Sequence, residues 1–339
     1  MKNTIKILVS VAIAALFLWL SFRNVAFDEI LEASKNMSWG WVFPFAITLI
    51  FAHFIRAERW RMLFHDEDKI PHRSTLFSGV MFGYLTNIAL PRVGEVARPV
   101  YVAKIIGESN SKLIGTIVLE RIIDVVSMLT IMVFVGVFLI SDPEILHNLF
   151  GIDFSDPAVY KTFLIWGAAA TIGFILGSWI LYRMVKTLSS GEGRVAGFIE
   201  KIRITAKSFF EGVMSIRKLK NWPLFVLYTA LIWAAYVLMM YFPLWMFDLH
   251  TIYDLSIADA VVLTMVSAVG ISIPTPGGTG SYHLFITYSL FVLYAIPEVT
   301  GLAFATITHA ATILMVLIIS PIMLAVEKYL SLKREAQGK

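Results

Sequence analysis

Long apolar segments fill most of this chain, and short polar segments separate them. An α-helix needs about 20 predominantly apolar residues to cross the hydrocarbon core of a bilayer. Stretches of about this length and character are residues 5–22, 41–63, 113–140, 160–182, 222–247 and 299–327. The pattern therefore predicts an all-α polytopic integral membrane protein with about six full spans.

Two further apolar stretches, residues 76–106 and 256–296, are each interrupted by a short polar break. The first break is PRVGEVARP at residues 91–99, and the second is PTPGGTGSYH at residues 274–283. Non-helical backbone at membrane depth survives only where protein or water satisfies its N–H and C=O groups. Each stretch is therefore predicted to be a re-entrant helical hairpin, and paired broken helices of this kind indicate a transport site.

The order span, span, hairpin, span occurs twice within one transmembrane domain, residues 1–339. The first half is residues 1–150 and the second is residues 155–330. Three crossings per half is an odd number, so the second half is expected to run inverted relative to the first. No sequence identity between the halves is visible, and the hypothesis rests on hydropathy and order. Such an inverted repeat allows alternating access around a central site.

Charge is distributed unevenly over the predicted loops. Residues 183–221 hold nine Lys or Arg against three Glu, whereas the loops on the opposite side are acidic. By the positive-inside rule both termini are expected in the cytoplasm, with the protein in the cytoplasmic membrane of a bacterium or archaeon. Residues 195–220 have helical apolar spacing and predict a cytoplasmic amphipathic helix. A solvated linker helix and a helix that recognises anionic lipid are both open.

Composition supports the membrane assignment and narrows the chemistry. Hydrophobic residues are 58% of the 339 and charged residues 15%, with a mean hydropathy of +0.76. The net charge of +4 is attributed to topology and lipid headgroups, so nucleic acid is not an expected partner. The absence of cysteine excludes disulfides and thiol catalysis. No motif predicts a metal or cofactor.

Charges inside the predicted membrane region are the first candidates for substrate binding. Ionisable side chains in a span mark a pathway, a proton relay or an internal ion pair. Glu120 and Asp124 are four residues apart on one helix face and repel unless a cation or proton intervenes. Arginines near a helix N-terminus suit a phosphate, or alternatively neutralise the carboxylates. The residues expected to form one cluster are Arg92, Glu95, Arg98, Glu120, Arg121 and Asp124.

The second break supplies the remaining candidates. Its glycines let backbone N–H groups approach an anion, although the Gly-Lys-Ser/Thr ending of a nucleotide loop is missing. His283 is open to three interpretations: a headgroup ligand, a proton carrier or a packing residue. His309 is expected to be structural. The residues assigned to the substrate site here are Gly277, Gly278, Gly280 and His283. The residues assigned to the inner-interface end of the second span are His53, Arg56, Glu58, Arg59 and Arg61.

Three motifs, in this order, resemble the lysylphosphatidylglycerol synthase transmembrane-domain family, a flippase-like domain. They are LPRVGEVAR at residues 90–98, ERxxD at residues 120–124, and PxPGGxG at residues 274–280. The resemblance implies lipid translocation, especially of aminoacylated phosphatidylglycerol, and some relatives accompany polyprenyl-phosphate glycosylation or hopanoid pathways. The aminoacyl-transferase domain of the fused synthases is not expected, because the chain ends at Lys339. His283 stands where many relatives have Glu, which puts a cationic headgroup in doubt.

These features favour a lipid flippase without enzymatic chemistry, which moves a phosphate-containing lipid between leaflets. The lipid is either a phospholipid or a polyprenyl-phosphate-linked lipid. One alternative is a membrane enzyme acting on a lipid phosphate, with Glu120, Asp124 or His283 as acid or base. Another is a non-transporting partner of such an enzyme. The expected partners are membrane lipids and a lipid substrate with an anionic headgroup; a homo-oligomer and a lipid-modifying enzyme are open.

Overall fold

A computed structural model describes residues 15–22, 27–35, 37–64, 70–135 and 194–336, together with residues 12 and 161. These residues are helices and short connections, and no strand occurs among them. The predicted span 160–182 lies outside the described residues except for Lys161, and much of the predicted span 5–22 lies outside them as well.

The described helices fall into two groups along the chain. Before residue 136 they are α2 (Phe27–Ser34), η1 (Trp39–Trp41), α3 (Val42–Arg61), α4 (Arg73–Ala89), α5 (Gly94–Ile106) and α6 (Asn110–Phe134). After residue 193 they are α9 (Arg194–Val213), η4 (Met214–Lys218), α10 (Trp222–Met246), α11 (Leu249–Ile252), α12 (Ile257–Ser272), η5 (Pro276–Gly278), α13 (Ser281–Tyr294) and α14 (Glu298–Ala336).

Among the described residues, three helical segments are long and apolar enough to cross a membrane. They are Trp39–Arg61, Trp222–Met246 and Glu298–Arg334, which correspond to the predicted spans 41–63, 222–247 and 299–327. The helix α6 occupies most of the predicted span 113–140, but its four charged residues at 112, 120, 121 and 124 lower its hydropathy. The all-α membrane class is confirmed, and the count of about six spans remains a prediction.

Each predicted hairpin is a pair of helices that pack on each other across a short connection. The helices α4 and α5 are joined by residues 90–93, and α12 and α13 by residues 273–280. The first break is therefore shorter than residues 91–99, because α5 begins at Gly94 and continues through Pro99. Pro91 does not begin the helix, since Arg92 has φ +59°, which a right-handed helix excludes.

Close packing of α4 on α5 depends on two facing glycines. A Cβ on Gly94 would collide with the carbonyl oxygen of Gly83, and one on Gly83 would lie 3.0 Å from the Cβ of Arg98. The side-chain oxygen of Asn87 accepts a hydrogen bond of 2.7 Å from the Gly94 N–H, which satisfies one of the free donors at the start of α5. The contact positions Arg98 in the interior, where it is 4% exposed.

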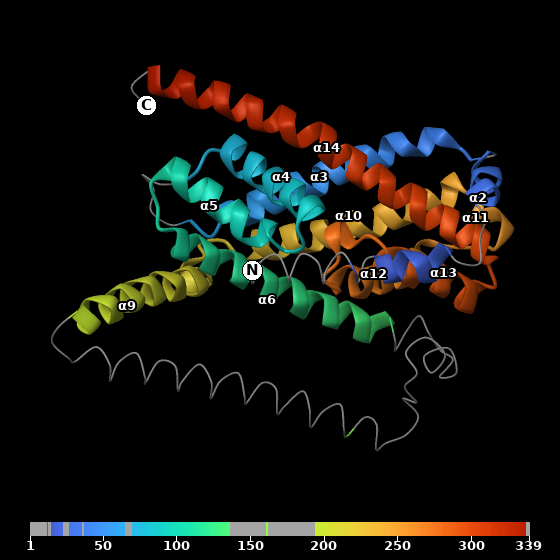
Figure 1. Ribbon diagram of the computed structural model, residues 1–339, viewed down its shortest axis with the longest axis horizontal. Helices are drawn as coiled ribbons and strands as arrows, with labels where there is room; N and C mark the ends of the chain where they lie inside the picture. The colour runs from blue at the N-terminus through green and yellow to red at the C-terminus, as the bar shows by residue number, and fades with distance from the viewer. Residues whose placement is uncertain are drawn as a thin grey trace.

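The two groups of helices make corresponding contacts (Figure 1). α3 packs on α4 and α5 on α6, just as α10 packs on α12 and α13 on α14. α3 and α10 contact each other, and the first helix of each hairpin contacts the last helix of the other group, α4 with α14 and α12 with α6. The order helix, helix pair, helix is thus repeated among the described residues, and its interpretation as an inverted repeat remains a prediction.

Two apolar cores follow this division. One, around α3 to α6, includes Trp60, Leu76 and Met81, which are at most 1% exposed. The other, around α10 to α14, includes Leu263 and Phe304, both fully buried. The polar groups described below lie beside these cores.

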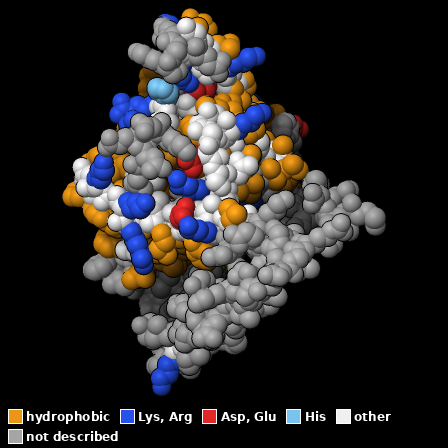
Figure 2. Space-filling model, turned by 90° about the vertical axis from the view of Figure 1, so that its left-hand side faces the viewer, with side chains coloured by type: hydrophobic (Ala, Val, Ile, Leu, Met, Phe, Trp, Pro, Cys, Tyr) orange, Lys and Arg blue, Asp and Glu red, His pale blue; other side chains and the backbone are white. Residues whose placement is uncertain are grey.

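Basic side chains gather at one end of the molecule. Figure 2 views the left-hand end of Figure 1, where α5 meets α6 and α14 ends, and shows many Lys and Arg side chains with few acidic ones. α9 packs along α6 near this end and continues into η4. Together, α9 and η4 occupy the residues predicted to form the amphipathic helix, whose place at the membrane surface remains a prediction.

Candidate functional site

Five charged side chains from three helices meet in the interior, and we name them the charge cluster. Arg56 and Arg59 come from α3, Arg98 from α5, and Glu120 and Asp124 from α6. The first four residues are between 1% and 4% exposed, and the side chain of Asp124 is 13% exposed. Charges buried to this degree require partners, which the cluster supplies from within.

Glu120 accepts hydrogen bonds from two arginines. The Nη1 and Nη2 atoms of Arg98 donate to its two carboxylate oxygens, each over 3.1 Å, and Nη1 of Arg56 donates over 2.6 Å. Nη2 of Arg59 lies 3.7 Å away. The Arg98 guanidinium also lies 4.1 Å from the centre of the Trp60 ring. The two-pronged ion pair with Glu120 and the cation–π contact with Trp60 therefore fix the position of the Arg98 side chain.

Asp124 completes the cluster on the neighbouring turn of α6. Nη2 of Arg59 donates to its Oδ1 over 2.6 Å, and Nη1 of Arg56 donates to its Oδ2 over 3.2 Å. Arg56 thereby bridges both carboxylates and removes the repulsion expected between them. Two hydroxyls of α10 accept further hydrogen bonds, Tyr236 from Arg56 over 2.7 Å and Thr229 from Arg59 over 3.3 Å.

The charge cluster holds three arginines against two carboxylates, which is a formal excess of one positive charge. Buried polar atoms in it and beside it also lack hydrogen-bond partners. The Nε atoms of Arg56 and Arg98 have no hydrogen-bond partner, nor does either ring nitrogen of His53, which is 5% exposed. The His53 ring packs on Tyr84 at 4.1 Å. Excess charge with free donors favours an anion as ligand.

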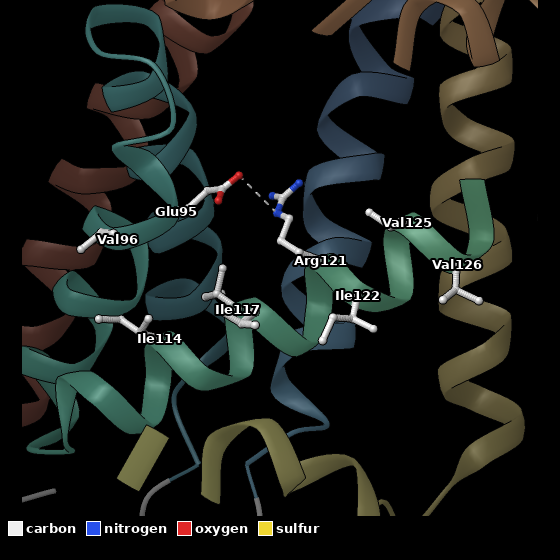
Figure 3. Close-up of a pocket in the computed structure, with 9 residues that line it drawn as sticks. Glu95, Val96, Ile114, Ile117, Arg121, Ile122, Val125 and Val126 are labelled. Carbon is white, nitrogen blue, oxygen red and sulfur yellow. Dashed lines mark ion pairs between the residues drawn. The ribbon is translucent and has the colours of Figure 1, made fainter. Parts of the chain in front are cut away.

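Two further predicted residues attach to the cluster at its edge. Arg121 lies with Nε 3.7 Å from a carboxylate oxygen of Glu95 and with Nη1 4.0 Å from Asp124. The Arg121 and Glu95 side chains point toward each other from α6 and α5 (Figure 3). This pair adds one charge of each sign, so the excess positive charge is unchanged.

Arg92 does not join the other five predicted residues, and the expectation of one cluster of six is wrong on this point. Its exposed guanidinium donates from Nη2 to the backbone oxygen of Ser272 over 2.5 Å, at the end of α12. The left-handed backbone at Arg92 precedes α5, so this residue does not share the helical face of Arg98. Arg92 instead connects the tips of the two hairpins.

The sequence assigns Arg56 and Arg59 to the inner-interface end of the second span, and they do lie in the last two turns of α3, but their role as ion-pair partners was not predicted. They are the cations that neutralise Glu120 and Asp124. Their spacing of three residues within an apolar segment complements the spacing of four between the carboxylates, because both spacings place side chains on one helix face. That match is the signal from which the pairing could have been inferred.

A polar cluster of a different kind lies between the second hairpin and α14, and it is formed by Thr279, Tyr282, His283, Thr308 and His309. The Gly280 N–H donates to Nδ1 of His283 over 3.4 Å, and the two histidine rings lie 5.1 Å apart. Tyr282 stacks on His309 and hydrogen bonds to Thr308 over 3.0 Å. We name this group the neutral cluster, since it contains no carboxylate, arginine or lysine. His309 has the packing environment expected of a structural residue.

The three glycines of the second tip have left-handed backbones. Their φ angles are +59° at Gly277, +79° at Gly278 and +86° at Gly280, and glycine adopts such angles most readily. The tip rests against the first hairpin, where a Cβ on Gly277 would lie 3.6 Å from the Cα of Ile88. The second tip therefore lies against the end of α4 beside the first tip, while the depth of both tips in the membrane remains a prediction.

The described residues contain no group of three or more His, Asp or Glu side chains placed to hold a metal ion. Comparison with known protein families gives a match over most of the chain. The chain matches the lysylphosphatidylglycerol synthase TM region over residues 7–320. No curated protein and no solved structure matched. Because the match covers nearly all of the 339 residues, the chain belongs to the lysylphosphatidylglycerol synthase transmembrane-region family.

Proposed function

We propose that the protein moves a phosphate-containing lipid between the two leaflets of the membrane, without enzymatic chemistry. The family indicates a membrane function related to lipids. The corresponding contacts of the two helix groups support an inverted repeat with two re-entrant hairpins. In such repeats the substrate site lies near the bilayer midplane, where the repeats meet.

The observation that supports this function most directly is the charge cluster. Ionisable side chains within membrane helices are rare and mark substrate or ion pathways. This cluster lies between α3, α5, α6 and α10, adjacent to the first hairpin, and has one arginine in excess. A lipid phosphate supplies the missing negative charge, and arginine binds phosphate through its planar fork.

The orientation follows from the basic end of the molecule. The end shown in Figure 2 is rich in Lys and Arg, and the positive-inside rule places such an end in the cytoplasm. The C-terminal end of α14 lies there (Figure 1). We accordingly propose a multi-pass protein of a bacterial or archaeal cytoplasmic membrane with both termini in the cytoplasm.

The test is headgroup accessibility of a labelled phospholipid in vesicles that contain the purified protein. The double variant Arg98→Gln/Glu120→Gln removes one charge of each sign, so the net charge of the cluster is unchanged while its phosphate-binding arginine is lost. The matched control is Glu327→Gln/Arg334→Gln, which neutralises the 2.6 Å ion pair between these residues of α14.

We expect lipid movement to stop in the cluster variant and to continue in the control, with both proteins monodisperse. Equal lipid movement in the two variants would contradict the proposal and assign the charge cluster a structural role. Wild-type protein that moves no lipid would favour the alternatives, a membrane enzyme or an accessory partner acting on a lipid phosphate.

A further inference from the structure

A groove of about 430 Å³ runs along the outer side of α5 and α6 (Figure 3). Seven of its nine lining residues are aliphatic: Val96, Ile114, Ile117, Val118, Ile122, Val125 and Val126. Five of these, at positions 96, 118, 122, 125 and 126, are between 37% and 59% exposed. The volume is within the range of about 300–1,000 Å³ that is typical of ligand pockets.

The two remaining lining residues are the charged pair Glu95 and Arg121. Their side chains are 39% and 43% exposed, and the 3.7 Å between Arg121 Nε and the Glu95 oxygen is longer than a hydrogen bond. Nε of Arg121 is buried and has no hydrogen-bond partner, so the exposed part of the guanidinium is the part that a ligand can reach. A guanidinium held loosely against an apolar surface is available to an external phosphate.

The groove follows α6 from Ile114 to Val126, with Arg121 between its ends. Twelve residues of helix extend over about 18 Å at 1.5 Å per residue. An aliphatic surface of that length with one cationic group matches an amphiphile that has a phosphate and a hydrocarbon tail. A free phosphate ion would leave the aliphatic walls without an occupant.

Arg121 also connects the groove to the charge cluster. It follows Glu120 in α6, and its Nη1 lies 4.0 Å from Asp124. Arg121 is thus one ion-pair distance from a carboxylate of the charge cluster. Glu95, on the opposite wall, is the carboxylate that an incoming phosphate would displace.

We infer that this groove is the lateral entry site of the lipid, in which one hydrocarbon tail lies along α6 while the phosphate pairs with Arg121. The identity of the ligand as the transported lipid rests on the proposed function. The site itself rests on the groove and its charged pair. A phospholipid and a polyprenyl phosphate share this chemistry, and separate probes distinguish them.

The test uses the purified protein in phosphatidylcholine vesicles that contain a trace of a lipid with a photoactivatable diazirine in its tail. Three probes are compared, a phosphatidylglycerol, a polyprenyl phosphate and a diacylglycerol without phosphate. Labelled residues are identified by peptide mass spectrometry. Leu129, which is 52% exposed on the same helix but does not line the groove, is the reference for ordinary lipid contact, and Ile122, 46% exposed, reports on the groove.

We expect a phosphate-bearing probe to label Ile122 in preference to Leu129, and an excess of the same unlabelled lipid to compete at Ile122 alone. The probe that shows this preference identifies the lipid class. Arg121→Gln should reduce labelling at Ile122 by about tenfold, which corresponds to the loss of one charge-assisted contact. Val125→Trp, at a groove residue that is 49% exposed, narrows the groove and retains the charges, so it should reduce labelling similarly.

Equal labelling of Ile122 and Leu129 by all three probes would overturn the inference, and so would a failure to label Ile122 at all. The result for lipid movement is independent of the result for lipid labelling. Selective labelling in a protein that moves no lipid would retain the site and reject the proposed function. Lipid movement that continues in Val125→Trp would retain the function and reject this groove as its entry.

Discussion

The two hairpins occupy corresponding places among the helices but are surrounded by opposite kinds of polar chemistry. In the first, the second helix of the hairpin contacts α6 through the two-pronged ion pair of Arg98 with Glu120. In the second, the corresponding helix contacts α14 through the ring stack of Tyr282 on His309 and the hydroxyl of Thr308. One interface is ionic, and the other is formally uncharged.

The difference shows that similar contacts between helices do not require similar side chains. A buried ionic interface is stable only while every partner is present, and its excess charge can bind a ligand. A neutral interface of hydroxyls and rings tolerates the loss of a member, and it positions the glycine tip beside the first hairpin. We infer that recognition of an anion belongs to the first half and that the second half provides a rigid backbone opposite it.

The largest expected effect is the loss of a carboxylate from the charge cluster. Glu120→Leu leaves three buried arginines with Asp124 alone, and removing one partner of a buried ion pair costs about 3–5 kcal/mol. The free energy of unfolding, measured by denaturant titration in mixed micelles, checks this value. The control is Glu95→Gln, in the half-exposed pair, which should change stability by at most about 1 kcal/mol. Similar values for both variants would show that the cluster is hydrated.

A smaller loss is expected when an arginine of the charge cluster is replaced by lysine. Arg56 donates to Glu120, Asp124 and Tyr236 through its planar guanidinium. Lysine retains the charge but cannot reproduce this fork, so Arg56→Lys should cost about 1.5–3 kcal/mol, the value of one hydrogen bond to a charged group. The same titration measures it. An unchanged stability would indicate that charge alone, without geometry, stabilises the cluster.

A substitution in the neutral cluster should reduce the stability of the protein by a smaller amount. Tyr282→Phe removes the hydroxyl that pairs with Thr308 over 3.0 Å, and a hydrogen bond between neutral groups contributes about 1 kcal/mol. Thermal unfolding in detergent is sensitive enough to detect this difference. A cost as large as that of Glu120→Leu would remove the contrast between the two clusters.

The membrane class and the positions of the hairpins were predictable because both depend on local sequence. Apolar length indicated α3, α10 and α14, and Pro and Gly marked the two breaks. The ends of the first break were not predictable from prolines alone. Pro99 is accommodated within α5, and the backbone reversal occurs at Arg92, a residue type that rarely adopts positive φ.

The candidate site was predicted in part, because sequence reveals which charges need partners but not which partners they find. Glu120 and Asp124 were recognised as a pair that needs a cation. Their partners Arg56 and Arg59 are more than 60 residues away, and only the packing of α3 beside α6 and α10 brings the four together. Arg92 was misassigned for the complementary reason, since it is close in sequence but faces the other hairpin.

The smallest expected effect on stability distinguishes the contribution of the Arg92 backbone from that of its side chain. Arg92 has φ +59° and donates to the Ser272 oxygen. Arg92→Ala loses this hydrogen bond and retains the left-handed backbone, so it should destabilise by about 1 kcal/mol. Arg92→Gly loses the same bond but relieves backbone strain of about 1–2 kcal/mol, partly offset by the greater freedom of glycine in the unfolded chain. The glycine variant should therefore melt above the alanine variant and close to the wild type in detergent. If both variants melt together, the positive φ does not strain the fold, and the connection between the two tips depends on the side chain alone.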